Sequence, residues 1–247
     1  MVYLSIIVPA YNEEDRLPNT IEQIIQFVND NKFSSEILII DNASTDSTFR
    51  ISEDYSRKYS KNRVYKEPQK GKGNAIRMGM MKASGKYRFM CDADLSMPIE
   101  EINKFLPPFC NHDIVIGSRE QKGSIRYNEP RFRHLAGRIF NFFVRLLILH
   151  NINDTQCGFK LFKEKIAVDI FNSQAIGGWA FDVEILYIAK LRGYSIKEVP
   201  ISWYYHENSK VNTLRDSIRM IDEIFRIHYN SRNGLYNKNK DTEKEHL

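Results

Sequence analysis

Two carboxylates, one residue apart, lie where a strand should give way to a helix. Asp92 and Asp94 follow residues 87–90, which are expected to form a short strand, and Pro98 comes soon after them. Proline suits the first turn of a helix, whose N–H groups have no partner within the helix. Ligands bind at this edge of an open α/β sheet, and hard divalent ions prefer oxygen ligands. Asp-Ala-Asp therefore predicts a Mg²⁺ or Mn²⁺ site that holds substrate phosphates, although an isolated Asp-x-Asp is more often a turn or helix cap.

The composition is that of a folded globular protein. The chain has 247 residues, of which 42% are hydrophobic and 27% charged, enough for one large domain or two small ones. Its three cysteines show no Cys-x-x-Cys spacing, which favours a reducing compartment over a disulfide framework. No signal peptide is visible, and no apolar run reaches the length of about 18 residues that a membrane span needs. These features predict a cytoplasmic protein.

Strands and helices alternate through the first 117 residues. Continuous β-branched segments such as 4–8 and 37–40 are typical of buried parallel strands, and each is followed by a helical pattern. This alternation predicts a parallel, doubly wound sheet whose right-handed crossovers place all the strand C-termini on one edge. Four polar side chains would then converge on one crevice: Tyr11, Glu13, Asp41 and Asp94.

A crevice with several carboxylates fits a nucleoside diphosphate. One carboxylate can accept from the N–H of a base, a second can hold ribose hydroxyls, and a third can bind the metal that bridges the phosphates. A Rossmann dinucleotide site is discounted because residues 9–14 contain no glycine. The loop at Gly71 and Gly73 is not a P-loop. That loop fits a basic turn before a helix as well as it fits a nucleotide contact.

Several short motifs occur in the order seen in family 2 glycosyltransferases with the GT-A fold. They are residues 7–14, 39–46, 71–75, 92–94 and 117–119. Three later segments resemble the dolichyl-phosphate glucosyltransferases more closely than the mannosyl branch: residues 154–162, 179–184 and 208–210. The resemblance covers about residues 3–230, and several motifs in fixed order are far more specific than any one alone.

The resemblance implies an α/β GT-A fold, with a Rossmann-like, mostly parallel sheet flanked by helices and amphipathic interface helices in the C-terminal half. It implies a single domain over residues 1–230, with a nucleotide-binding half at 1–118 and an acceptor- and membrane-facing half at 119–230. The polar tail 231–247 is expected to be disordered. The implied reaction is inverting transfer of a hexose, best glucose from UDP-glucose, to a dolichyl or polyprenyl phosphate at the cytosolic face of a membrane.

The same resemblance assigns roles to individual positions. The nucleotide sugar would meet Pro9, Tyr11, Glu13, Asp41, Asp92, Ala93 and Lys210. Asp94 would bind the metal, and the catalytic residues would be Asp94, Arg119 and Asp182. One departure is Asn42, because many relatives carry a second aspartate there.

A phosphate acceptor changes what catalysis requires. A sugar hydroxyl needs a general base, whereas a phosphate monoester, with a second pKa of about 6, is already charged at neutral pH. It mainly needs positioning, for which arginine is well suited. Asp182 falls where many family 2 enzymes carry a base; here it could instead bind sugar hydroxyls, orient the acceptor or simply begin a helix. The candidates to hold the acceptor phosphate are Arg119, Arg131, Arg133 and Lys160.

Segment 131–150 predicts peripheral attachment to a membrane. His134, Arg138, Asn141 and Arg145 form one helical stripe among mostly apolar residues. Residues 119–145 contain seven basic and two acidic side chains, which gives a local net charge of +5. Such a helix suits the headgroup layer, with a core helix as the alternative. A second amphipathic helix, 212–229, has Leu214, Ile218, Ile221, Phe225 and His228 on one face, which packs on the core or lies on lipid.

Other functions fit parts of the sequence. A transferase for a saccharide or protein hydroxyl would use Asp182 as base, and a nucleotidyltransferase of similar fold would release pyrophosphate. An inactive relative would bind nucleotide as a scaffold, but the intact Asp92/Asp94 pair with Arg119 and Lys210 argues against it. A nucleic-acid binder is less compatible still, because no RNA- or DNA-binding motif is present. The sequence does not distinguish among glucose, N-acetylglucosamine and mannose as the donor sugar.

Overall fold

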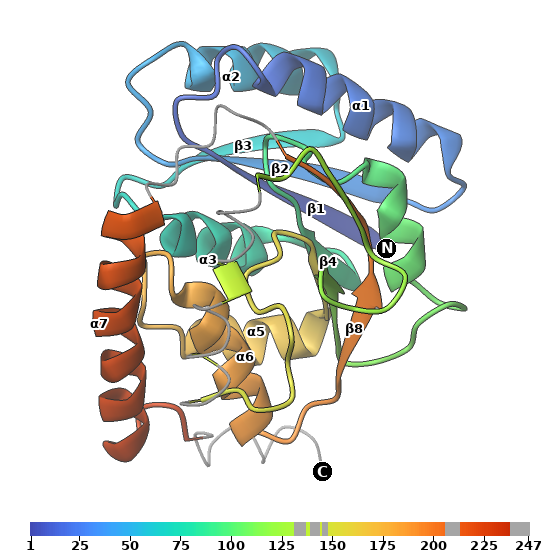
Figure 1. The fold of residues 1–247 in the computed structure, drawn as a ribbon. Helices are drawn as coiled ribbons and strands as arrows, with labels where there is room; N and C mark the ends of the chain where they lie inside the picture. The colour runs from blue at the N-terminus through green and yellow to red at the C-terminus, as the bar shows by residue number, and fades with distance from the viewer. Residues whose placement is uncertain (131–136, 139–143, 145–147, 206–212, 238–247) are drawn as a thin grey trace.

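The first half of the chain alternates strands with helices, as the sequence predicted. The computed structural model describes residues 1–130, 137–138, 144, 148–205 and 213–237, without the side chains of 213–218. Parallel pairing joins β1 (Leu4–Ala10), β2 (Ser35–Asp41), β3 (Asn62–Lys66) and β4 (Tyr87–Met90). The connecting helices are α1 (Leu17–Asp30), α2 (Thr48–Lys58) and α3 (Lys72–Lys82). Because β1 to β4 run parallel, their C-terminal ends lie at the same edge of the sheet (Figure 1).

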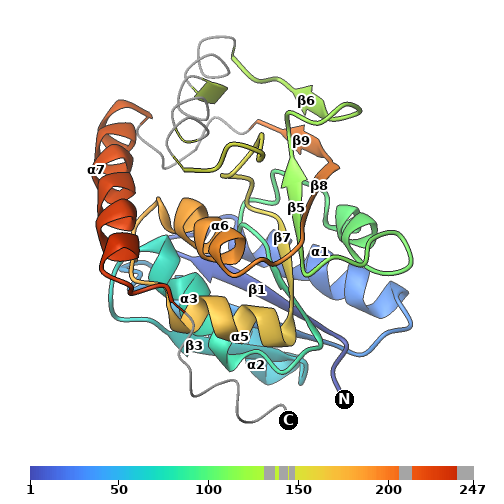
Figure 2. The same ribbon diagram turned by 90° about the horizontal axis from the view of Figure 1, so that it is seen from below.

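The second half of the chain completes the same sheet. Strand β5 (Ile114–Ser118) pairs in parallel with β8 (Ile196–Pro200), and β7 (Lys160–Lys163) enters antiparallel between β4 and β5. The strand order is β3-β2-β1-β4-β7-β5-β8. A separate two-stranded sheet pairs β6 (Ile125–Tyr127) with β9 (Ser202–Tyr204), and it lies near the tip of β5 at the top of Figure 2. The two predicted halves therefore share one sheet.

Helices cover both faces of the sheet (Figures 1 and 2). On one face, α1 and the 3₁₀ helix η1 (Ile99–Phe105) pack on side chains such as Ile6 and Val8, with α2 beside them. On the other face, α3, α5 (Glu164–Asn172), α6 (Phe181–Leu191) and α7 (Thr213–Arg232) surround side chains such as Ile7 and Leu38. Successive strand residues point to opposite faces, so a sheet covered on both sides needs the continuous apolar runs that the sequence contains.

The residues at two helix starts are worth noting, because for one of them the sequence predicted a first-turn proline, Pro98, and for the other it offers Thr45 or Asp46 as a cap. The helix after the Asp-Ala-Asp turn is η1, a 3₁₀ helix, and Pro98 lies immediately before it. Helix α2 begins at Thr48, where the Asp46 carboxylate accepts from the Thr48 N–H at 2.9 Å. Asp46, which lies just outside the helix, therefore accepts a hydrogen bond from the first N–H of α2. The Thr45 N–H instead donates to the side chain of Asn12.

The predicted boundary at residue 230 moves towards the C-terminus. Helix α7 continues to Arg232, and Tyr236 beyond it is 1% exposed. The Tyr236 hydroxyl donates to the buried carboxylate of Glu184 on α6, at 2.6 Å. Residues 231–237 thus belong to the folded domain, and 238–247 lie outside the described residues. Within the described part of the chain, no helix is both long and apolar enough to cross a membrane.

Candidate active site

A pocket of about 460 Å³ lies at the C-terminal ends of β1, β2 and β4. Six of the residues predicted to meet a nucleotide sugar or its metal line it: Pro9, Tyr11, Glu13, Asp92, Ala93 and Asp94. The wall also includes Asn42, Lys70, Lys72, Trp179 and Arg219. The sequence left the basic loop with Lys70 and Lys72 open as a nucleotide contact, and it did not place the other three residues in a site. Trp179 and Arg219 come from the second half of the chain, so the pocket is not confined to residues 1–118.

Asp41 ends β2 just behind this wall. Its side chain is 3% exposed, and its Oδ1 atom has no hydrogen-bond partner among the described residues. A buried acceptor without a partner costs about 1–3 kcal/mol, so this position favours a ligand that donates a hydrogen bond. The neighbouring residue, Asn42, is the one that reaches the pocket surface.

The Asp-Ala-Asp turn is held from several sides. The Thr20 hydroxyl donates to the Ala93 carbonyl at 2.6 Å, and Asp94 Oδ1 accepts from the Ser96 N–H at 3.0 Å. Gly158 leaves the space that Asp92 occupies, because a Cβ at that glycine would lie 1.9 Å from Asp92 Oδ2. The two carboxylates are therefore fixed in place before any ligand arrives, and a hard divalent cation could bind them through oxygen.

Lys72 provides a positive charge against the same turn. Its Nζ lies 2.6 Å from Asp92 Oδ1. Burial alone would lower the pKa of Lys72, but the carboxylates of Asp92, Asp182 and Asp94 outweigh burial and raise it above its usual value. Lys72 therefore stays charged at physiological pH, beside two carboxylates in an open pocket.

Asn42 holds the loop that carries Lys72. Its amide donates to the Gln69 carbonyl at 2.7 Å, and its Oδ1 accepts from the Gly71 N–H at 2.7 Å. Gly71 has a φ of +138°, a conformation that favours glycine. The amide at Asn42 thus both donates and accepts, which an aspartate at this position could not do.

Arg119 follows β5, and Asp154 holds it in place. Nε and Nη2 of Arg119 donate to the two Asp154 oxygens at 2.7 and 2.8 Å, and its backbone N–H donates at 2.9 Å. Burial would raise the pKa of Asp154, but the guanidinium lowers it to about 2. The guanidinium predicted to hold the acceptor phosphate is therefore already bidentate with a carboxylate.

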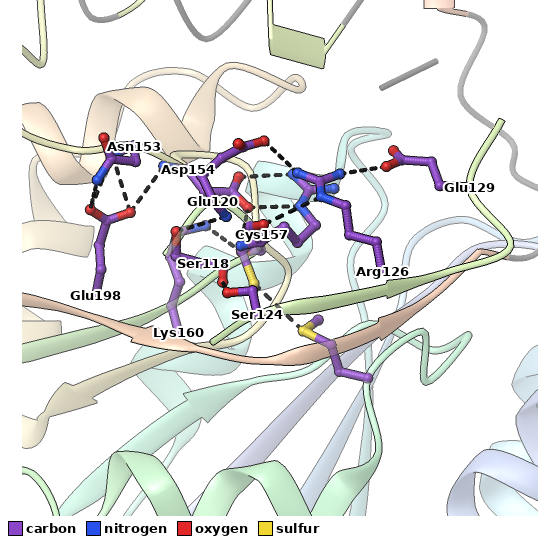
Figure 3. Close-up of polar contacts among 12 residues, drawn as sticks. Ser118, Glu120, Ser124, Arg126, Glu129, Asn153, Asp154, Cys157, Lys160 and Glu198 are labelled. Atoms are coloured by element: carbon purple, nitrogen blue, oxygen red, sulfur yellow. Dashed lines mark hydrogen bonds and ion pairs between the residues drawn. The ribbon is translucent and has the colours of Figure 1, made fainter. Parts of the chain in front are cut away.

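Further ion pairs and hydrogen bonds lie around Asp154 (Figure 3). Arg126 bridges Glu120 and Glu129. Glu198 accepts from the backbone N–H groups of Asn153 and Asp154, at 3.0–3.1 Å. Arg126 and Glu198 thus already have partners within the protein.

Lys160 and Asp182, predicted to hold phosphate and to act in catalysis, pair with each other in the interior. Lys160 is fully buried, and its Nζ donates to Asp182 and, at 2.7 Å, to the Cys157 carbonyl. Burial raises the pKa of Asp182 above its usual value, although Lys160 and Lys72 act to lower it. The ammonium of Lys160 lies against Asp182 and the Cys157 carbonyl, and Lys160 is not among the residues that line the pocket. Its contact with the acceptor phosphate stays a prediction.

Several predicted residues lie outside the described part of the chain. These are Lys210, Arg131, Arg133 and most of the segment 131–150. Their predicted roles in binding phosphates and a membrane stay predictions.

The comparisons with known proteins agree on the class. The chain belongs to glycosyl transferase family 2, whose domain matches residues 5–171. It is similar to the dolichyl-phosphate beta-glucosyltransferase of Dictyostelium discoideum, at 38% identity over 95% of this chain and 76% of that protein. The human protein of the same name is 36% identical over 84% of this chain and 69% of its own length.

Solved structures show the same fold at lower sequence identity. Glucosyl-3-phosphoglycerate synthase from Mycobacterium tuberculosis, in complex with Mn²⁺, UDP-glucose and phosphoglyceric acid, matches with a TM-score of 0.66 and 18% identity. The match covers 92% of this chain and 79% of that one. Mannosyl-3-phosphoglycerate synthase from Rubrobacter xylanophilus matches with a TM-score of 0.68 and 17% identity, over 94% of this chain and 75% of that one. The predicted GT-A fold is confirmed.

Proposed function

We propose that this glycosyltransferase moves glucose from UDP-glucose to a dolichyl or related polyprenyl phosphate, with inversion at the anomeric carbon. Two relatives that are 36–38% identical carry the name of that activity. A protein of the same fold has been solved with UDP-glucose and Mn²⁺. The open pocket with Asp92, Asp94 and Lys72 offers the charges that a nucleoside diphosphate needs.

In this proposal the donor lies with its base towards Asp41 and its phosphates towards Lys72. The uracil N3–H would donate to the partnerless Oδ1 of Asp41. Tyr11 and Glu13 would flank the nucleoside, and Asp92 and Ala93 would meet the ribose. Lys72 would release Asp92 and compensate charge on the diphosphate, because an ammonium attracts phosphate oxygens as a point charge. Lys210, outside the described residues, is proposed to join it.

The Asp-Ala-Asp turn suits a divalent metal, with Asp94 as the protein ligand. Among the described residues, no group of three or more His, Cys, Asp or Glu side chains is arranged to hold an ion. An ion with few protein ligands, completed by substrate phosphates and water, is the arrangement that Mg²⁺ favours, and Mn²⁺ shares its preference for oxygen. A bound ion would stabilise the charge that develops on the leaving UDP.

The buried pair of Lys160 and Asp182 is the observation that carries the choice of a phosphate acceptor. A general base must reach the proton that it removes, and Asp182 instead accepts from Lys160 in the interior. A phosphate monoester already carries the attacking negative charge near neutral pH. It therefore needs orientation and charge compensation, for which we propose Arg119 with Arg131 and Arg133.

A polyprenyl acceptor also requires a membrane. We propose peripheral attachment at the cytosolic face, through the basic segment 131–150. The local net charge of +5 at residues 119–145 supports attraction to anionic lipid.

The test is a matrix of donors and acceptors with the purified protein. UDP-glucose, UDP-N-acetylglucosamine and GDP-mannose are each incubated with a short, water-soluble polyprenyl phosphate, with the matching alcohol and with a saccharide. We expect UDP release only with UDP-glucose and the phosphate, and a β-linked product by NMR. The rate below pH 7 should follow ionisation of the acceptor phosphate. Transfer to the alcohol or saccharide, or release of pyrophosphate, would contradict the proposal.

A further inference from the structure

The residues that connect α5 to α6 form part of the wall of the pocket proposed for the donor. Helices α3, α5 and α6 lie side by side in Figures 1 and 2, and residues 174–178, which we call the back loop, run from α5 towards α6. Gly178, at the end of this loop, lines the pocket together with Trp179. The Lys72 ammonium lies 5.8 Å from the centre of the Trp179 ring. Lys72 thus has both Asp92 and Trp179 as neighbours, and the back loop leads directly into the second of them.

The back loop packs backbone to backbone on the loop that carries Lys72. The Gly73 N–H donates to the Gly177 carbonyl at 2.9 Å. The two loops are so close that a Cβ at Gly71 would lie 2.2 Å from the Gly177 oxygen. The side-chain amide of Gln174 adds a further contact, because it donates to the Gly73 carbonyl at 2.9 Å. A shift of the back loop would therefore shift the loop that positions the Lys72 ammonium.

Glu184 on α6 holds the back loop from the interior. Its side chain is fully buried, and its two oxygens accept from successive N–H groups of the loop, those of Ala175 and Ile176, both at 2.9 Å. Burying a carboxylate is costly unless hydrogen bonds compensate it. An apolar side chain would fill the same space without that cost, but it could not hold two backbone N–H groups.

Tyr236 in turn holds Glu184. Its hydroxyl donates to Glu184 Oε1 at 2.6 Å, and its carbonyl accepts from Nη2 of Arg192 at 3.0 Å. The same Arg192 nitrogen donates to the hydroxyl of Ser173, the residue before the back loop, at 2.6 Å. The segment that follows α7 is therefore connected, by contacts between described residues, to a loop of the pocket wall.

We propose that Glu184 is a positioning residue for the donor: held by Tyr236, it fixes the back loop so that Lys72 and Trp179 are in place before the nucleoside diphosphate binds. A loop that is already ordered loses no conformational freedom on binding, which favours affinity. The inference rests on the proposed function, because that function assigns Lys72 to the diphosphate. The alternative is a network that only stabilises the fold.

The first experiment measures the dissociation constant of UDP, with Mg²⁺ present, by titration calorimetry. Glu184→Gln keeps the size of the side chain, but its amide nitrogen cannot accept a hydrogen bond, so one of the two loop N–H groups loses its acceptor. We expect UDP to bind about tenfold more weakly, which corresponds to about 1.4 kcal/mol. Unchanged UDP affinity in a folded Glu184→Gln variant would overturn the proposal.

Glu36→Gln is the matched control, at a second buried carboxylate. Glu36 is 3% exposed and accepts from the Ser84 N–H at 2.6 Å, but it lies near the N-terminal end of β2, away from the pocket. This variant should lose thermal stability and bind UDP like the wild type. A loss of affinity as large as that of Glu184→Gln would show that damage to any buried carboxylate weakens binding, and it would contradict a specific role for Glu184.

Hydrogen exchange followed by NMR tests whether the effect passes from Glu184 to the Lys72 loop. The Gly73 amide contacts the back loop and not Glu184 itself. In Glu184→Gln it should exchange about tenfold faster relative to the amides of β1, which report the stability of the whole domain. Equal acceleration at Gly73 and in β1 would mean that the variant only lowers global stability, and the positioning role would be refuted.

Tyr236→Phe keeps the test valid if Glu184→Gln does not fold. It retains the ring, which packs against Tyr187, and removes the hydroxyl that donates to Glu184. UDP should bind roughly threefold more weakly, and unchanged affinity would contradict the role of Tyr236. In the Glu184→Gln background the same change should have little further effect, because Tyr236 acts through Glu184. Fully additive losses would show that the two residues act independently.

Initial rates separate this inference from the proposed function. KM for UDP-glucose should rise together with the UDP dissociation constant, whereas KM for the short polyprenyl phosphate should stay unchanged. If the wild type transfers glucose and both variants do so equally well, the positioning role is refuted and the proposed function stands. If the wild type binds no UDP, the proposed function itself fails, and the positioning role fails with it.

Discussion

The pocket pair of Asp92 with Lys72 and the interior pair of Asp182 with Lys160 use the same residue types in opposite ways. In the pocket, Asp92 and Lys72 contact each other but keep 28% and 19% of their side chains exposed. In the interior, the Lys160 and Asp182 side chains are 0% and 5% exposed. The Lys72 ammonium has room to turn from Asp92 to a ligand, whereas the second pair is enclosed. Sequence motifs singled out Asp92 and Asp182 alike, and the structure shows that their surroundings differ: Asp92 lines a pocket, whereas Asp182 is enclosed.

The energetic consequence of this difference is testable. Breaking a buried ion pair by removing one partner leaves a charge without compensation and costs about 3–5 kcal/mol. Removing a partly exposed charge destabilises the fold much less, because water replaces the lost partner. Variants in the pocket should therefore reduce activity, and variants in the interior should reduce stability.

The largest effect is expected at Asp94. Asp94→Ala should lower turnover by about 100-fold or more, since a metal contributes several kcal/mol to stabilising the leaving group. Its melting temperature should stay close to that of the wild type. Mn²⁺ binding followed by electron paramagnetic resonance, in the presence of UDP, gives a readout independent of turnover. Asp15→Asn, at an exposed carboxylate outside the pocket lining, is the control; full wild-type activity in chelator would remove the metal from the proposal.

An intermediate effect, on stability, is expected from the interior pair. Asp182→Asn should lower the melting temperature by roughly 6–20 °C, because the Lys160 ammonium stays buried without its counter-ion. Lys160→Met/Asp182→Leu, which removes both charges, should recover much of that loss. Calorimetry and single-turnover rates on the same samples separate the two roles. An unchanged melting temperature with a loss of about 10⁴-fold in kcat would identify Asp182 as a base and favour a hydroxyl acceptor.

The smallest effect is expected at Asn42. Asn42→Asp removes the donor to the Gln69 and Glu67 carbonyls, at 2.7 and 3.3 Å, but keeps an acceptor for the Gly71 N–H. Loss of these two bonds, about 0.5–1.5 kcal/mol each, should loosen the Lys72 loop and raise KM for the donor roughly threefold or more, with kcat little changed. Initial-rate kinetics measure this split. An unaltered KM would show that the loop is held without Asn42.

The sequence predicted the regular part of this architecture well. The apolar runs at β1 and β2 are long and continuous, and parallel winding then forces Tyr11, Glu13 and Asp92 to one edge. The contacts of Lys72 were not predictable, because a Gly-Lys-Gly loop has no spacing that fixes where its side chain points. The pairing of Lys160 with Asp182 joins residues 22 positions apart, on a strand and a helix, whose relative placement depends on β7.

Helix α7 shows a second limit of periodicity. A helical pattern states which residues share a face, but the face that packs is decided by the shape of the partner surface. Two adjacent apolar rows were available, and the core took Met220 and Ile224 in place of Ile221 and Phe225.

The antiparallel insertion of β7 has a consequence for the order in which the protein can fold. Strand β5 has two neighbours in the sheet, β7 and β8, and both come later in the chain. A nascent chain that ends at residue 118 can pair β1 to β4, but β5 still lacks every partner, and one edge of β4 is open. The sheet is complete only when residues 160–163 and 196–200 have been synthesised, and contacts across such long sequence separations slow folding. An N-terminal fragment would present exposed strand edges, and we therefore expect it to aggregate.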